Sequence, residues 1–510
     1  MLRFLVHDER GLATQWPLVN AHLLGSDDTS RKGGISFRDG CITCKTSDPH
    51  AAHAFSLEVD AGKAGRLMLQ TCLLRQREEP YRLYEELARH RIKLFLEKSE
   101  NWLFLDPAKA PEAFEKFEQA RTTFVMGMTE PDPVRSELLH RDALALGIFA
   151  SEQLVMKRTE WQLHRRFGAK VPDYALGIRV PIEKAPEQLT QVLSSQFDTV
   201  RVPTPWSLIE PTQGKFSFDQ VDRWMAWAKK SGRKIIAGPL LDAGAAGVPG
   251  WVRPSLADPA KLKDRLYPFI REVVARYAPL NPIWNTAASV HLNEAAPLTT
   301  EAMVNVTRMA GVTVRQLVKN AKLLVEVGDP FSDIPPATEG AIGAIVYIRA
   351  LLAEGVPMDM VGLPVLLGGT APGQGARDLM QVCAMVERFT SRKEMPPIVL
   401  SACAVPSAPQ PDAGTGWWRE PWSARSQGAW APMVFQIALA NPSVHLVVWD
   451  RLRDDAGYGI RDSGLFAPDG SPKPAAERLL ATRRRLRTPL GPFAGAGADA
   501  SGATAAGSGD

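Results

Sequence analysis

A repeated alternation of buried strands and amphipathic helices constrains this chain more than any other feature. Its clearest unit contains two β-branched segments flanked by turn residues, Thr199–Val202 and Lys234–Ala237, which are typical of buried strands. Between them, Ser217 and Gln220 have the spacing of a capping box, and Gly232 follows as a stop signal. A strand, a helix and a second strand in this order predict a right-handed βαβ unit in a parallel sheet.

The same unit recurs through the second half of the chain. Six further segments have the pattern of buried strands: residues 174–180, 289–293, 322–327, 358–363, 398–401 and 444–449. Helical patterns separate them. Eight βα units over roughly 250 or more residues predict an α/β fold with a TIM (β/α)8 barrel. An open doubly wound sheet is the alternative, but the chain lacks a glycine fingerprint after its first strand.

The remainder of the chain has different patterns. Residues 1–76 hold short alternating segments broken by turn sequences, which predict a small β-sandwich that could bind sugar, pack or dimerise. Residues 77–170 are helical and predict a connector to the barrel, which we expect over residues 171–490. Residues 491–510, rich in glycine and alanine, cannot bury a core and are expected to be a disordered tail.

Composition argues against several classes of function. The 60 basic and 56 acidic residues nearly balance, so the chain lacks the charge footprint of a nucleic-acid-binding protein. No apolar run approaches the roughly 20 residues of a membrane span. No secretion signal is evident at the start, so a cytoplasmic location is the default expectation, with export left open.

Cysteine usage indicates neither disulfides nor a metal. Five cysteines do not suggest a disulfide framework. Cys41 and Cys44 have the spacing of half a zinc site, but no second CxxC or spaced histidine pair accompanies them. We expect no metal and no organic cofactor, and the sequence leaves the oligomeric state open.

Several motifs then occur in a fixed order between residues 171 and 490. The stretch PTPWSLIEPTQGKFSFDQVDRWMAWAKKSGRKI, with PGW after it, precedes LNEAA, AKLLVEVGD, GVPMDMVGL, ALANPSVHLVVWD and SGLFAPDGSPKPA. In this order they resemble the landmarks of glycoside hydrolase family 10, the endo-β-1,4-xylanases. The resemblance implies a barrel that hydrolyses O-glycosyl bonds in β-1,4-linked, xylan-type glycans and has a carbohydrate as its partner.

The resemblance supplies one of two catalytic carboxyls. Glu294 follows Asn293 near the expected end of the fourth strand, as the acid/base glutamate of the family follows its asparagine. A retaining glycosidase needs a second carboxyl roughly 5–5.5 Å away. The family carries it in a Thr-Glu-Leu-Asp-like segment that ends the seventh strand, where this chain has Ala402. A methyl group cannot form a glycosyl ester, so the nucleophile position is lost.

The sugar-binding positions of the family are partly retained. Arg201 and Pro205 stand where family members carry polar side chains before a loop tryptophan. Trp206, Asn293 and Trp449 match, and the resemblance implies that they contact the sugar.

Three further residues are candidates from their own positions. His291 lies two residues before Asn293 and should share its side of a strand, although a core histidine is the alternative. Trp417 and Trp418 follow the seventh strand, where their rings could stack on a sugar or clamp a long loop to the barrel rim.

Two functions stay open at this point. In a hydrolase, Glu294 could act on a water together with another acid near the barrel mouth, since inverting enzymes tolerate roughly 6.5–9.5 Å between carboxyls. The candidates for this second acid are Asp242, Glu326, Asp329 and Asp450, each of which could instead cap a helix or pair with an arginine. Alternatively, because Ala402 replaces the nucleophile, the chain is a non-catalytic barrel that binds a carbohydrate or a protein.

Overall fold

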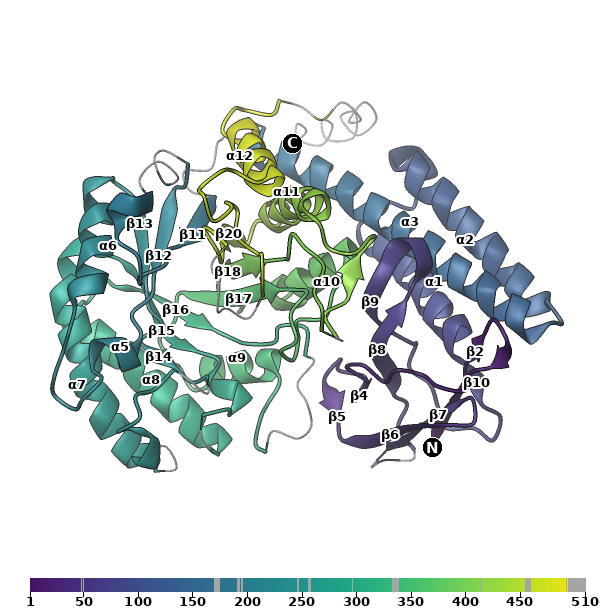
Figure 1. Cartoon of the computed structure of the whole chain (residues 1–510), viewed down its shortest axis with the longest axis horizontal. Coiled ribbons are helices and arrows are strands. Elements are labelled where there is room, and N and C mark those ends of the chain that lie inside the picture. The colour runs from purple at the N-terminus through teal and green to yellow at the C-terminus, as the bar shows by residue number, and fades with distance from the viewer. Residues whose placement is uncertain are drawn as a thin grey trace, which may run out of the picture.

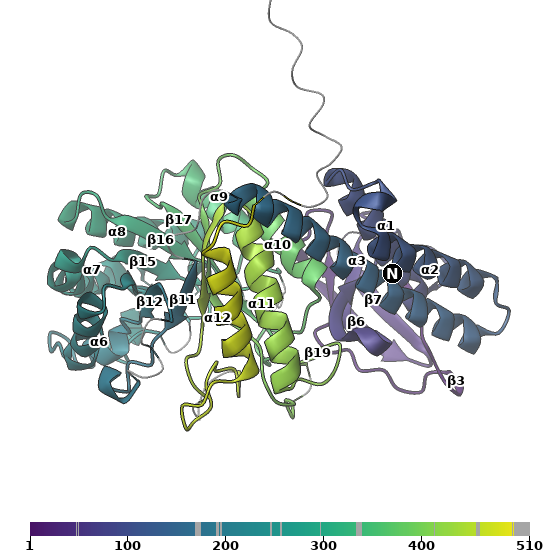
Figure 2. The same ribbon diagram turned by 90° about the horizontal axis from the view of Figure 1, so that it is seen from above.

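The computed structural model places a barrel, a layer of long helices and two small sheets side by side (Figure 1). Seen from above, the barrel and the small sheets lie at opposite ends, with α11 (Ala424–Ala440) and α12 (Pro474–Leu486) between them (Figure 2). The structure describes residues 1–46, 48, 50–168, 175–189, 193, 196–244, 247–255, 258–295, 297–332, 339–412, 414–454, 460–491 and 493. The expected disordered tail therefore lies outside the described residues, apart from 491 and 493. No described helix is long and apolar enough to cross a membrane.

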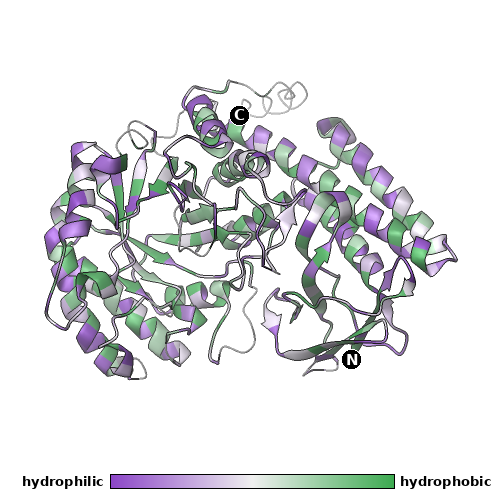
Figure 3. Ribbon diagram, in the orientation of Figure 1, coloured by the Kyte–Doolittle hydropathy of each residue, from purple (hydrophilic) through white to green (hydrophobic). Residues whose placement is uncertain are grey.

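Eight parallel strands close into the barrel. In ring order they are β11 (Leu176–Arg179), β12 (Thr199–Val202), β13 (Lys234–Ala237), β15 (Ile283–Ala288), β16 (Lys322–Glu326), β17 (Met360–Leu366), β18 (Ile398–Ala404) and β20 (Val444–Trp449), and β20 pairs with β11. Figure 3 shows hydrophobic residues concentrated on these strands and mixed faces on the helices around them. Their burial on both faces explains the near-continuous apolar runs in the sequence. The closed ring confirms the predicted (β/α)8 barrel and excludes the open sheet.

The fourth strand lies earlier in the chain than the sequence predicts. The strand expected over residues 289–293 is wrong, because β15 ends at Ala288 and residues Val290–Leu292 form a 3-10 turn. Ser289 and Asn293 flank that turn with left-handed φ angles of 55° and 59°, which no strand can accommodate. The residues at the end of β15 are small and give no clear hydrophobic pattern. The segment after them is more apolar, so the sequence pattern indicates a strand there instead.

Helices surround the barrel and begin with varied caps. They include α6 (Asp219–Lys230), α7 (Pro259–Tyr277), α8 (Thr300–Leu317), α9 (Ala344–Ala353) and α10 (Leu379–Thr390). The capping box predicted at Ser217 and Gln220 is wrong: α6 begins at Asp219, and no side chain caps it. The box appears instead at the starts of α10, with Asp378 and Gln381, and of α11.

Two small sheets, with the two-stranded pair β2 (His7–Asp8) and β3 (Gly11–Leu12), form the N-terminal part of the molecule. One has the strand order β10 (Tyr81–Arg82), β1 (Leu2–Leu5), β7 (Cys41–Thr46), β6 (Gly33–Arg38), and the other β19 (Trp417–Trp418), β9 (Gly65–Gln70), β8 (Ala54–Asp60), β4 (His22–Leu24), β5 (Ser30–Arg31). Phe4 of the first sheet stacks on Phe55 of the second, with ring centroids 5.1 Å apart. The sheets therefore face each other across a shared apolar layer. One strand, β19, comes from the barrel loop that follows β18.

Three helices connect these sheets to the barrel: α1 (Leu83–Asn101), α2 (Pro111–Thr129) and α3 (Pro133–Phe167). Asp132 caps α3, and Pro133 occupies its first position, where the missing backbone N–H of proline costs no hydrogen bond. A buried ion pair of 2.6 Å joins Arg91 of α1 to Asp378 at the start of α10. One continuous hydrophobic core includes residues of the sheets, the connecting helices and the barrel.

Candidate active site at the barrel mouth

A cavity of about 480 Å³ opens at the carboxyl ends of the barrel strands. Loops after β11, β12 and β20 line it, together with β14 (Leu241–Asp242), a short strand after β13 that pairs with the end of β15. Four prolines line it, together with six charged residues, namely Arg179, Glu183, Asp242, Asp450, Arg451 and Arg453. Active sites of (β/α)8 enzymes occupy this end of the barrel, and the combination of apolar and charged side chains suits a ligand.

The surroundings of Asp242 in this cavity shift its pKa. It pairs with Ala288 across β14 and β15, and its Oδ1 accepts a hydrogen bond of 3.0 Å from the backbone N–H of Gly244. Burial raises the pKa of Asp242 above its usual value, and the negative charge of Glu326 acts in the same direction. The Gly244 hydrogen bond, Arg201 and Arg179 oppose this rise in pKa. Asp242 therefore keeps its proton to a higher pH than a free aspartic acid.

Glu294 lies close to Asp242, although not where the sequence placed it. It is exposed and stands beyond the 3-10 turn rather than at the end of β15, since that strand ends at Ala288. A methyl group built on Gly244 would lie 3.2 Å from Asp242 Oδ1 and 4.0 Å from Glu294 Oε2. The two carboxyl oxygens thus flank one glycine within roughly 7 Å of each other, inside the upper limit of roughly 9.5 Å between glycosidase carboxyls.

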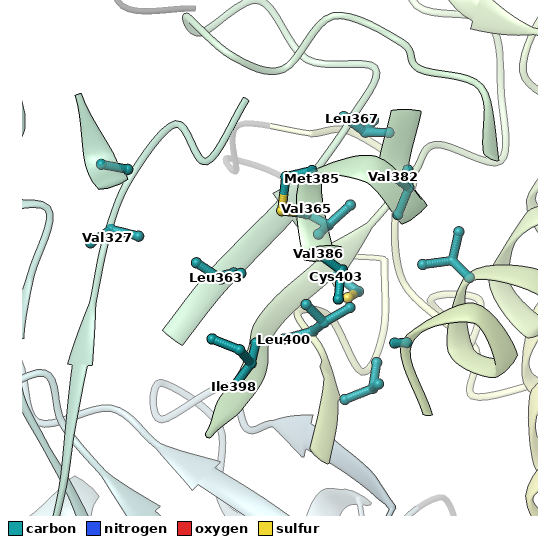
Figure 4. Close-up of a cluster of buried hydrophobic side chains, with 14 of the residues drawn as sticks. Val327, Leu363, Val365, Leu367, Val382, Met385, Val386, Ile398, Leu400 and Cys403 are labelled. Atoms are coloured by element: carbon teal, nitrogen blue, oxygen red, sulfur yellow. The ribbon is translucent and has the colours of Figure 1, made fainter. Parts of the chain in front are cut away.

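The seventh strand offers no carboxyl to this site. In β18 the pairing with β17 shifts by one residue, so that Leu400 pairs with Leu363 but Ala402 with Pro364. Leu400 and Cys403 both pack in the cluster that contains Val386 of α10 (Figure 4), and such a bulge re-aims the residues between them. Burial raises the pKa of the Cys403 thiol far above its usual value, so the thiol stays protonated and is a poor nucleophile.

An ion pair fills the centre of the barrel below the cavity. Arg201 of β12 contacts Glu326 of β16 at 2.8 Å, and its Nη1 donates a hydrogen bond of 2.8 Å to the backbone oxygen of Ser401. Gly362 separates Glu326 from Ser401, and a Cβ there would lie 3.2 Å and 3.1 Å from their Cβ atoms. Glu326 is therefore held by an arginine across a tightly packed strand.

The two remaining acidic candidates, Asp450 and Asp329, also lie beside basic side chains. Asp450 lies 3.4 Å from Arg179 and 3.7 Å from Arg451. Asp329 does not line the mouth cavity; it is buried beside Gly373 in the electrostatic field of Arg377 and His22. Of the four acids that the sequence offered, Asp242 lines the cavity and lies near Glu294, whereas Asp450, which also lines the cavity, pairs with arginines.

The predicted tryptophan contacts lie inside the protein. Trp206 stacks on Phe269, and its Nε1 donates a hydrogen bond of 2.8 Å to Glu210. The indole of Trp449 is buried and bonded to the backbone of Ser463. Neither indole presents an open ring face, so both support loops of the barrel rim.

Trp417 and Trp418 form β19 and pair with β9 of the N-terminal sheet. Trp418 is buried, and its Nε1 donates a hydrogen bond of 2.6 Å to Glu152 of α3. Of the two interpretations that the sequence allowed, this arrangement favours the loop clamp over sugar stacking.

His291 and Asn293 shape the loop after β15. His291 accepts a hydrogen bond of 3.0 Å from the backbone N–H of Gly328, and its Nδ1 lies 2.7 Å from the backbone oxygen of Ile342. Burial lowers the pKa of His291 to about 4, so the ring is a neutral core histidine. The Asn293 amide bonds to Leu298 and to the backbone of Glu339. Both side chains fix the loop that presents Glu294.

Within the described part of the chain, no group of three or more His, Cys, Asp or Glu side chains is arranged to hold a metal ion. Sequence reasoning included Asp242 only as one of four acids. Its burial and its neighbour Gly244 decide its importance, and a local sequence pattern encodes neither.

Comparisons with known proteins point to carbohydrate-active enzymes. A family model described as beta-galactosidase (glycoside hydrolase 42) matches residues 179–264. Endo-1,4-beta-xylanase B of Humicola insolens is 32% identical over 72 residues, which are 14% of this chain and 20% of that protein. The matched segment thus spans about a fifth of this curated relative.

Several solved structures are similar to part of this chain. Xylanase 10B from Thermotoga maritima is 15% identical, with a TM-score of 0.48 over 64% of this chain and 98% of the other. Xylanase 10C from Cellvibrio japonicus is 15% identical, with a TM-score of 0.49 over 62% and 72% of the two chains. A glycoside hydrolase family 10 structure from Paenibacillus barcinonensis is 17% identical, with a TM-score of 0.46 over 61% and 94%.

Proposed function

We propose that this chain is a divergent glycoside hydrolase of the family 10 xylanase type, which cleaves a β-linked glycan with Asp242 and Glu294. The observation that carries the proposal is the pair of carboxyls flanking Gly244, one with a raised pKa and one exposed. The ordered motifs, the (β/α)8 barrel and the partial match to a xylanase support the same class of reaction.

The two carboxyls have environments that suit different roles. Burial raises the pKa of Asp242, so it holds its proton to a higher pH than a free aspartic acid, and it would donate that proton to the departing glycosidic oxygen. Glu294 is open to solvent and would accept a proton from a water that attacks the anomeric carbon. The water's oxygen then replaces the leaving group, and the proton lost by Asp242 is balanced by the proton gained by Glu294. Loss of the nucleophile at Ala402 does not block such a direct displacement.

Paired substitutions test this assignment. Asp242→Asn and Glu294→Gln should each lower kcat on xylan, aryl β-xylosides or aryl β-glucosides by about 100-fold or more. Asp264→Asn on the exposed face of α7 is the matched control and should leave kcat unchanged. If either carboxyl variant of an active enzyme keeps full activity, the assignment fails. Proton NMR of the first product should show inversion at the anomeric carbon.

A second candidate function is glycan binding without hydrolysis. The lack of an acidic residue in β18 favours it. Calorimetry with xylo-oligosaccharides would then show binding without turnover. Asp242→Asn would change the affinity only modestly, since an amide keeps the shape and hydrogen-bonding capacity of the carboxyl.

A further inference from the structure

A second cavity, of about 750 Å³, lies between the N-terminal sheets and the barrel. It is larger than the mouth cavity, and residues of β8, β9, α1 and α10 line it. Figure 1 shows these elements meeting on the side of the barrel where the small sheets pack. None of the residues assigned above to catalysis lines this cavity.

The charge of this cavity is one-sided. Three acidic side chains reach it, Asp28, Glu97 and Glu387. The basic side chains that line it are twice as numerous, namely Arg91, Lys93, Lys98, Arg158, Arg377 and Arg388. Such an excess of cations in a confined space attracts anions.

Carboxylates reduce this excess but do not remove it. Behind the wall, Arg91 pairs with Asp378 at 2.6 Å, and Asp329 and Asp378 act on Arg377. Glu387 is shared by two cations, with Lys98 Nζ at 2.7 Å from one oxygen and Arg158 Nη1 at 2.7 Å from the other. Lys93 contacts Glu97 only loosely, at 3.8 Å, and its side chain is 62% exposed.

Arg388 is the cation with the least direct compensation. Its guanidinium donates hydrogen bonds to the backbone oxygen of Pro330 and, at 3.0 Å, to the hydroxyl of Ser332. Both acceptors are neutral, and within the described chain no carboxylate forms an ion pair with Arg388. Asp28 and Asp329 act on it only through the longer-range field. Its Nε is buried without a hydrogen-bond partner among the described residues. Nη1, which makes no hydrogen bond to the described residues, is the part of this guanidinium from which an anion in the cavity could accept.

We propose that this cavity binds a small oxyanion, a phosphate or carboxylate group, with Arg388 as the principal ligand and Lys93 at the entrance. The Nη1 group of Arg388 and the ammonium of Lys93 would donate charge-assisted hydrogen bonds to the oxygens of either group. Strands β8 and β9, the connecting helix α1 and the barrel helix α10 all contribute to the wall. A bound anion would therefore stabilise the packing of these elements against one another. The proposal is independent of the glycosidase assignment.

Binding of inorganic phosphate to the full chain tests the site. Calorimetry at pH 7.5 should give a saturable signal, and phosphate should raise Tm more than chloride at equal ionic strength, because a ligand of the folded state stabilises it. A parallel titration with acetate distinguishes a phosphate site from a carboxylate site. Equal Tm shifts in phosphate, acetate and chloride would overturn the proposal.

Matched variants locate the ligand. Arg388→Gln should weaken anion binding at least 10-fold, whereas Arg392→Gln, which alters an exposed pair with Glu394, should leave it unchanged. If Arg388→Gln does not fold, Lys93→Gln replaces it, with an expected loss of about threefold or more. Unchanged affinity in the folded variants would refute the assignment.

Discussion

Asp242 stands apart from its acidic neighbours at the barrel mouth because it has no arginine in contact. Asp450 pairs with Arg179 and Glu326 with Arg201, whereas among the described residues Asp242 accepts a hydrogen bond only from Gly244. Its raised pKa follows from burial that nearby charges offset only in part. This is the environment in which a carboxylic acid can serve as a proton donor near neutral pH.

The pH dependence of catalysis should respond to Arg179. In the proposed mechanism Asp242 acts as the proton donor, so activity should fall as the pH rises through the raised pKa of that group. Arg179 lowers this pKa; its removal in Arg179→Met should therefore move the alkaline limb of kcat/KM to higher pH. Arg271→Met, in an exposed pair on α7, is the control and should leave the profile in place. An alkaline limb that does not move in Arg179→Met would contradict the role of Asp242.

Asp329 should make stability depend on pH. Burial raises its pKa to about 6 from 3.8, against the lowering effect of Arg377 and His22. Because the folded-state pKa is the higher one, the stabilising contribution is complete below about pH 4 and is lost as the pH rises through 6. Asp329→Asn should therefore gain about 1 to 3 kcal/mol relative to the parent chain between pH 4 and pH 8. Urea unfolding at both pH values measures this, and a pH-independent difference would disprove it.

Individual roles in the site were harder to predict than its general position. Trp206, Trp449 and Asn293 were expected to face the sugar, but their polar atoms bond to Glu210, Ser463 and Leu298 inside the protein. Residues that are distant in sequence determine which loop contacts a given side chain. A residue-by-residue match to a family cannot contain that information.

At the scale of elements, periodicity predicted strands well where burial was continuous. Thr199–Val202, Lys234–Ala237 and Val444–Trp449 occur as predicted. The fourth strand was misplaced because its last residues, Ala287 and Ala288, are small and resemble a loop in composition. The predicted strand end therefore lies five residues too late in the chain. The prediction wrongly placed Glu294 directly after the strand.

The start of α10 combines a cap with an ion pair. Asp378 accepts hydrogen bonds from the backbone of Met380 and Gln381 and also pairs with buried Arg91. Asp378→Asn keeps a capping oxygen but leaves the arginine charge unpaired, so it should cost about 3–5 kcal/mol. Ser423→Ala, which removes the partly exposed cap of α11, should cost about 1 kcal/mol.

Denaturant unfolding of both variants, with Arg91→Met and the double variant Arg91→Met/Asp378→Asn, measures the coupling. We expect the double variant to lose less than the sum of the single losses. Additive losses would show that the pair contributes no net coupling.

At the scale of the whole molecule, the sheets, connecting helices and barrel form one core. Arg91–Asp378, Lys98–Glu387 and Trp418–Glu152 cross between them. The sequence predicted each part from its own pattern. It could not predict their union, because contacts such as that between Trp417 and Arg66 have no local signal.

The chain should therefore unfold as a unit. Calorimetry should show one transition, and residues 171–490 expressed alone should aggregate, since they expose the surface that α3 and β9 cover. Two separate transitions, together with a soluble and folded isolated barrel, would contradict this expectation.

The strand β19 has a wider consequence. In many barrel enzymes the segments after the strands swing over the substrate, but here the one after β18 is hydrogen-bonded into a neighbouring sheet. A tethered segment of this kind cannot act as a moving cover over the barrel mouth. A chimaeric protein that contains only the barrel or only the N-terminal sheets would also have to include β19, because this strand joins the two parts.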